Sequence, residues 1–183
     1  MIRDKSFIKG KVTATVRTAD GQIKRFKPGF FRRLVGMPGK LMICVNHNIV
    51  TNEGDALIAD LMANTPARQK LDNSHAYIEV GTAYIGSTGE KAATGCNTPS
   101  GSREAMESGY PQLKAAWGEA NDNVVCYRAI FEAGDLNATI DEAALMNASS
   151  DGDCLAYAEV SPAAVVASTD TLQIDWELTF LGA

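Results

Sequence analysis

The feature that most constrains the fold is an alternating stretch near the end of the chain, DTLQIDWELTF at residues 170–180. Every second residue is large and apolar, namely Leu172, Ile174, Trp176, Leu178 and Phe180. Successive side chains of a β-strand point to opposite faces, so this alternation predicts a strand with one buried face. Burying five such side chains contributes about 10 kcal/mol before conformational entropy is subtracted. This strand is therefore expected to form a wall of the core.

Shorter segments of the same kind predict about six further strands, near residues 12–16 and within residues 40–46, 75–82, 122–134, 138–147 and 153–161. One segment has helical periodicity instead, because Leu57, Ile58, Leu61 and Met62 share a stripe and Asn52 is placed to cap it. We therefore predict a mainly β protein, a β-sandwich or jelly-roll-like fold with one helical insertion and an extended N-terminal arm. Residues 1–40 are expected to form a basic hairpin and arm. Residues 41–183 are expected to form the β-sandwich body, with a helix near residues 53–64.

Two stretches give weaker signals. Residues 84–102 are rich in Gly, Ser and Thr, which predicts a long loop. Loops of this length in compact domains are usually functional or serve as interaction surfaces. Residues 103–117 favour some helix, interrupted at Gly109 and Pro111.

The charges divide unevenly along the chain. Residues 1–40 hold eleven Lys and Arg but two acidic residues, and residues 41–183 hold the other six basic and twenty acidic residues. The two parts therefore carry +9 and −14, although the whole chain carries −5. A basic segment on an acidic body can bind nucleic acid, an anionic membrane or the body of a neighbouring copy. The last option balances the charge without another molecule, and it favours a homo-oligomer.

The densest basic stretch is KRFKPGFFRR at residues 24–33, which also holds three phenylalanines. Two Pro-Gly pairs, at residues 28–29 and 38–39, indicate an extended arm rather than one regular element. We expect this arm to bind a partner through Lys24, Arg25, Phe26, Lys27, Phe30, Phe31, Arg32 and Arg33. Apolar anchors flanked by charges are typical of protein interfaces, so we favour a contact between subunits.

Two other interpretations of the arm stay open. The phenylalanines could pack into the protein's own core, as ordinary loop residues do. Alternatively, the arm could bind nucleic acid, with the cations on phosphates and the rings stacked on bases. The charge of −14 on the rest of the chain argues against nucleic acid, because it repels phosphates.

The sequence offers no catalytic constellation. The glycine-rich nucleotide motifs, GxSxG and HExxH are absent. The four cysteines form no CxxC pair and the chain has only two histidines, so we expect no metal site. Cys44 and His47 lie on one predicted strand and point to opposite faces, which excludes them as nucleophile and base. We expect no enzyme, no cofactor and no metal.

Four segments that follow the arm carry a resemblance to a known family. NIVTNEGDALIADLM, at residues 48–62, opens an amphipathic helix with Asn-apolar-apolar-Thr-Asn-x-Gly, and YIEVGT at residues 77–82 ends a strand in Val-Gly-Thr. ATIDEAALMN, at residues 138–147, contains Ile-x-Glu-Ala-x-Leu, and the final strand has Trp176 at its centre. In this order the segments resemble virion proteins of tailed bacteriophages, over residues 46–183.

This resemblance implies a structural role in the particle, without catalysis or cofactor. It implies as partners further copies of the chain and other virion proteins, such as the major capsid protein or proteins of the neck and tail. A subunit with a reaching arm fits a capsid decoration (cement) protein or a neck or tail adaptor better than a tail-fibre or collar attachment protein. The expected location is the virion after synthesis in the host cytoplasm, since the sequence shows no signal peptide and no apolar run of about 20 residues.

Overall fold

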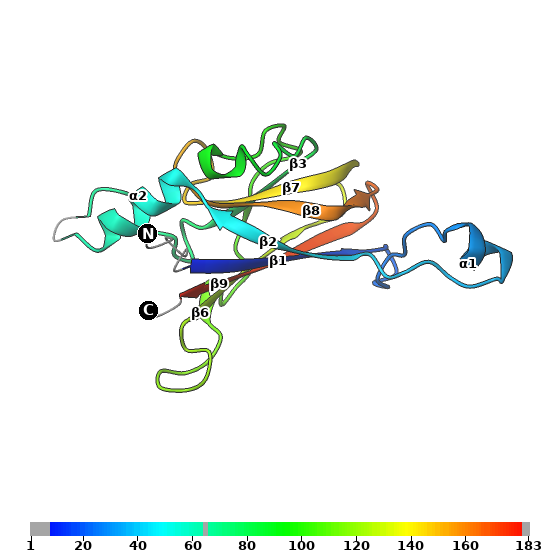
Figure 1. The fold of residues 1–183 in the computed structure, drawn as a ribbon, viewed down its shortest axis with the longest axis horizontal. Helices are drawn as coiled ribbons and strands as arrows, with labels where there is room; N and C mark the ends of the chain where they lie inside the picture. Colours follow the sequence, from blue (N-terminus) through cyan, green and yellow to red (C-terminus); the bar gives the residue numbers. More distant parts are fainter. Residues whose placement is uncertain (1–7, 64–65, 181–183) are drawn as a thin grey trace, which may run out of the picture.

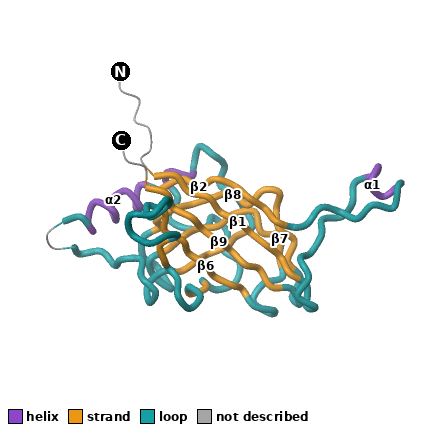
Figure 2. The backbone as a smooth tube through the Cα atoms, turned by 90° about the horizontal axis from the view of Figure 1, so that it is seen from below, coloured by secondary structure: helices purple, strands orange, loops and turns teal. Residues whose placement is uncertain are grey.

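The computed structural model describes residues 8–63 and 66–180, which form one antiparallel sheet of nine strands with two helices (Figures 1 and 2). The strands follow one another in the sheet in the order β4-β3-β7-β8-β2-β1-β9-β6-β5. Their bounds are β1 Ile8–Arg17, β2 Ile43–Val50, β3 Tyr77–Gly81, β4 Glu104–Ala105, β5 Gln112–Leu113, β6 Val124–Phe131, β7 Ala138–Met146, β8 Cys154–Val166 and β9 Thr171–Phe180. The prediction of a mainly β fold with a helical insertion is confirmed.

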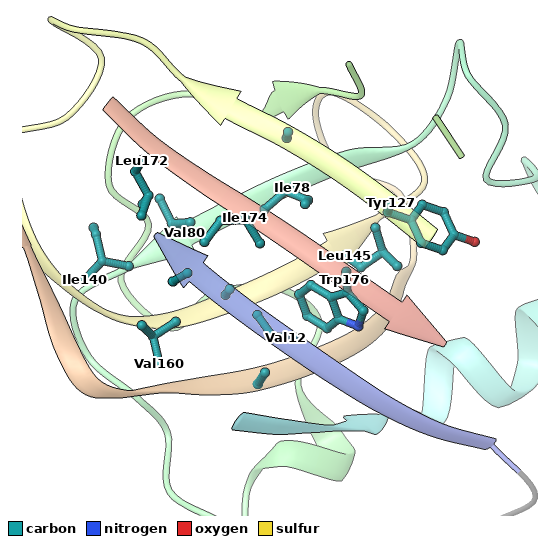
Figure 3. Packing of buried hydrophobic residues seen from close by; sticks show 14 of the residues in the cluster. Val12, Ile78, Val80, Tyr127, Ile140, Leu145, Val160, Leu172, Ile174 and Trp176 are labelled. Carbon is teal, nitrogen blue, oxygen red and sulfur yellow. The ribbon is translucent and has the colours of Figure 1, made fainter. Parts of the chain in front are cut away.

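The sheet curls until its two ends meet. The chain just after β4, at one edge, reaches β6 near the other edge, where the Glu107 N–H donates to the Arg128 carbonyl at 2.8 Å. One face of the sheet is therefore turned inward, and a single apolar core fills the space that it encloses. Figure 3 shows side chains of β1, β3, β7, β8 and β9 converging on this core. The curl lets one sheet supply both walls that a sandwich needs.

The final strand contributes four large alternating side chains to this core. Leu172, Ile174, Trp176 and Leu178 of β9 are each at most 1 % exposed, as their spacing predicts. Phe180, at the end of the strand, is 39 % exposed. The Trp176 indole N–H donates to the Asn48 side chain of β2 at 3.1 Å, so the largest buried ring also has its polar atom satisfied.

The predicted helix is α2, Asn52–Leu61, and it differs from the prediction at both ends. Its cap is Thr51, whose hydroxyl accepts from the Gly54 N–H at 3.0 Å, so the assignment of Asn52 as the cap was wrong. The helix ends at Leu61 rather than near residue 64. Gly54 allows the first turn to press against β8, because a Cβ there would lie 2.1 Å from the Leu155 carbonyl oxygen.

Residues 103–117 contain no helix, contrary to the weak helical signal. This stretch supplies the two short strands β4 and β5, which pair with β3 and β6 at opposite edges of the sheet. Gly109, with φ +87°, turns the chain between them. Pairing at the sheet edges has overridden the local preference for helix.

The first strand, β1, belongs to the body. The expected division of the chain into an N-terminal unit of residues 1–40 and a body therefore does not match the fold. β1 lies between β2 and β9, where Val12 is opposite Trp176. The part that projects from the body is instead residues 18–42, which connect two central strands (Figure 1). We call residues 18–42 the arm from here on. Arg3 and Lys5, two of the eleven basic residues of the expected N-terminal unit, lie outside the described residues.

The buried face of β9 gives a direct test of the fold. Ile174→Ala removes a side chain that is 0 % exposed, and it should lower the free energy of unfolding by about 2–5 kcal/mol. Thr179→Val, on the opposite face of the same strand, should change it by no more than about 0.5 kcal/mol. Urea unfolding followed by circular dichroism measures both. Equal effects of the two variants would contradict the assignment of the faces.

Candidate functional site

The arm consists of two paired legs, residues 18–27 and 39–42, and a helical tip, residues 28–38. The legs continue β1 and β2 outward: the Lys24 N–H donates to the Val16 carbonyl at 2.9 Å, and the Met42 N–H donates to the Lys24 carbonyl at 2.7 Å. Further out, the Phe26 N–H donates to the Lys40 carbonyl at 2.9 Å. Beyond this pair, α1, Phe30–Leu34, lies at the opposite end of the molecule from α2 (Figures 1 and 2). The arm is thus an extension of the sheet's most central strands.

Three of the eight predicted partner-binding residues hold the base of the arm. Lys24 forms an ion pair with the buried carboxylate of Asp170, and the Arg25 guanidinium donates to the Gly39 carbonyl at 2.9 Å. Phe26 packs against the core. Gly39 is buried between the legs, where a Cβ would lie 1.7 Å from the Phe26 carbonyl oxygen. Lys24 and Phe26 thus join the arm to the body, and Arg25 links its two legs.

The tip exposes a cluster of large apolar side chains. Phe30 and Phe31 are 75 % and 81 % exposed, and their rings meet edge to face with centroids 5.7 Å apart. Leu34, Val35 and Met37 extend this cluster and are each at least 50 % exposed. None of the residues of α1 is buried, so the interpretation that Phe30 and Phe31 pack into the protein's own core was wrong. The prediction from the sequence missed Leu34, Val35 and Met37, although they directly follow the predicted residues.

Cations of the tip and of the adjoining ends of the legs lie next to this apolar cluster in the chain. Arg32 donates to the Pro38 carbonyl at 2.9 Å and so closes the tip. Lys27, Arg33 and Lys40 are exposed, and none of them forms an ion pair with another described residue. This set of five exposed apolar side chains bordered by cations resembles the apolar core and polar rim of a protein interface.

A second cluster, of buried carboxylates, lies on the outer face of β3 and β7. Glu142 accepts hydrogen bonds from the N–H groups of Asn97 and Thr98, both at 2.9 Å, from the Ala83 N–H at 3.3 Å and from the Tyr157 hydroxyl. Glu79 accepts from the Cys96 N–H at 2.6 Å and from the Arg103 guanidinium at 2.8 Å. Both carboxylates are therefore bound to groups of the chain itself.

These contacts give the carboxylates a structural role. They fasten residues 82–103, which include the loop predicted over residues 84–102, onto the sheet. This loop lies beside a small apolar cluster that includes Tyr157 and Cys96. Burial and the Glu142 carboxylate raise the pKa of Tyr157, which keeps its hydroxyl protonated as a donor. A general acid or base needs a free position toward a substrate, and the four bonds to Glu142 fill its lone pairs.

The cysteines are not placed for nucleophilic chemistry. Burial raises the pKa of Cys44 to about 11 and that of Cys154 to about 12, so both remain thiols near neutral pH. Cys44 points inward and donates to the Pro162 carbonyl, while His47 lies on the outer side of β2 with Nδ1 3.3 Å from the Gly10 carbonyl oxygen. The two side chains point apart, as strand geometry predicts. Within residues 8–63 and 66–180, no group of three or more His, Cys, Asp or Glu is arranged to hold a metal ion.

Comparisons with known proteins add no identification. No family model, no curated protein and no solved structure matches the chain. Within the part of the chain that the structure describes, no helix combines the length and apolar character needed to cross a membrane. The arm is therefore the candidate functional site on the evidence of its own geometry.

The buried carboxylate of Glu142 provides a test of its structural role. Glu142→Ala leaves three N–H groups of the loop without their acceptor, so it should lower the free energy of unfolding by about 3 kcal/mol or more. Hydrogen exchange at Asn97 and Thr98 should become faster than in the wild type. Asp141→Ala removes a neighbouring carboxylate that accepts from the Tyr84 N–H, and it serves as the control. An unchanged stability of the Glu142 variant would contradict this role.

Proposed function

We propose that this protein is a non-enzymatic structural subunit that attaches to neighbouring subunits through the tip of its arm. The observation that carries this proposal is the exposed cluster of Phe30, Phe31, Leu34, Val35 and Met37 at the end of a projecting, hydrogen-bonded arm. Exposed apolar patches of this kind mark interaction sites in soluble proteins. The two ring anchors and their bordering cations match the composition of binding hot spots.

The setting that we propose is a tailed-bacteriophage virion, as a capsid decoration subunit or as a neck or tail adaptor. This part rests on the four sequence segments that resemble virion proteins. Three of these segments lie in the sheet as β3, β7 and β9, and the fourth forms the end of β2 and α2. All four belong to the body, so the resemblance concerns the scaffold and the arm supplies the attachment.

Replacement of the tip tests the proposal. Residues 28–38 lie beyond the last hydrogen-bonded pair of the legs, and an Asn-Gly turn can join the legs in their place. Since no residue of α1 is buried, the melting temperature should stay within a few degrees of that of the wild type. Self-association, measured by sedimentation velocity, and incorporation into particles should both be lost. Normal association and incorporation of the folded variant would contradict the proposal.

A nucleic-acid-binding arm is the second candidate, favoured by the exposed rings of Phe30 and Phe31 beside Lys27 and Arg33. It predicts salt-sensitive binding of DNA that Lys27→Ala combined with Arg33→Ala weakens about tenfold. Under the subunit proposal we expect no binding of single-stranded or duplex DNA at 50 mM salt, measured by fluorescence anisotropy. Binding that the double variant removes would favour the nucleic-acid candidate instead.

A further inference from the structure

A loop on another part of the body exposes the most accessible large apolar side chain of the described chain. Trp117 is 92 % exposed, in the connection between β5 and β6. This connection, residues 114–123, is called the Trp117 loop. In Figure 1 it is the yellow-green loop below β6, far from α1 at the end of the arm. Figure 2 also separates the two features, so the tip and the Trp117 loop of one chain do not meet.

The backbone of the Trp117 loop is fixed, although its indole is not packed. The Gly118 N–H donates to the Asp122 carboxylate at 2.8 Å, and the Glu119 N–H donates to the Ala116 carbonyl at 3.1 Å. At the start of the loop, the Lys114 ammonium pairs with Glu177 of β9 at 2.9 Å. A loop held in this way presents Trp117 with little loss of conformational entropy on binding.

The chemistry of the loop is complementary to that of the tip. Its one cation, Lys114, is paired with Glu177, while the exposed Glu119 forms no ion pair with another described residue. Trp is the best aromatic partner for a cation, and it is among the residues most enriched in binding hot spots. The tip offers exposed Arg33 beside two phenyl rings, and Lys27 lies next to the tip at the end of one leg. A groove that adjoins the loop is lined by Tyr110 and Leu113 and by two ion pairs, Lys114 with Glu177 and Arg128 with Asp175.

Two other exposed apolar places fit the tip less well. The outer face of β2 exposes Ile43 and Val45, but the outer side of neighbouring β1 carries Lys11 and Arg17, which repel a basic tip. The end of α2 exposes Met62, but the nearby Asp60 carboxylate already accepts from the N–H groups that follow the helix. The Trp117 loop is therefore the acceptor that both charge and apolar character favour.

We infer that the arm tip of one copy binds the Trp117 loop of a second copy. The inference rests on the proposed function, and it names the partner and the surface that the arm meets. The contact joins two different surfaces, so two copies can exchange it reciprocally about a two-fold axis. Where they do not, the contact is heterologous and repeats from copy to copy in one direction. Such contacts close into a ring when the rotation between copies permits it and otherwise extend into a filament.

Fluorescence and sedimentation of the full chain test the inference. The chain has two tryptophans, and Trp176 is 0 % exposed, so a change of emission on association reports on Trp117. We expect a shift to shorter wavelength as concentration rises, and no shift after the tip replacement. Trp117→Ala should weaken association about tenfold or more. Met62→Ser, which removes a large apolar side chain that is 84 % exposed elsewhere, should leave association unchanged.

Charge reversal tests whether the tip and the Trp117 loop contact each other directly. Arg33→Glu and Glu119→Lys should each weaken association about threefold, and the two reversals combined should restore it. If the tip replacement abolishes association but Trp117→Ala does not weaken it, the inference is overturned and the proposed function stands. Association that survives the tip replacement overturns both. A loss with Trp117→Ala and with Met62→Ser alike also overturns the inference, because the effect is then not specific to the loop.

Discussion

The placement of β1 between β2 and β9 is the constraint on which both the core and the arm depend. Val12, Ala14 and Val16 face inward from this strand and are each at most 2 % exposed, so β1 is fixed by the core and by two hydrogen-bonded neighbours. The chain leaves β1 and returns through β2, which makes the two legs of the arm adjacent from their start. An arm rooted in central strands is held in a set direction, unlike a terminal extension, and its tip is presented at a fixed place.

Buried carboxylates of the body bind groups of the same chain, and in this the body differs from the tip of the arm. Asp170 at the base of the arm pairs with Lys24, and Glu142 binds the loop that covers β3 and β7. Each buried carboxylate therefore stabilises a connection of the fold. The exposed charges without an ion-pair partner among the described residues include Arg33 of the tip and Glu119 of the Trp117 loop.

The sequence could predict much of the body because its signals are local. The alternation from Leu172 to Leu178 sets which face of β9 is buried, and the stripe of Leu57 and Ile58 identifies α2. It could not place β1, because a strand with three inward residues looks the same at the centre of a sheet as in a separate hairpin. Position in the sheet is decided by pairing with β2 and β9, which lie far along the chain. The same limit explains the missed edge strands β4 and β5.

The candidate site could also be predicted only in part, because composition identifies the segment but not which of its side chains are exposed. Composition singled out KRFKPGFFRR, but it could not separate Lys24, Arg25 and Phe26, which anchor the legs, from Phe30, Phe31 and Arg33, which are presented to solvent. It also gave no reason to notice Trp117, since an isolated Trp in a segment with weak signals is more often a core residue. Exposure separates the two tryptophans in the structure: Trp176 completes the core, whereas Trp117 is 92 % exposed. A surface that a chain builds but does not cover itself is where a second molecule gains most by binding.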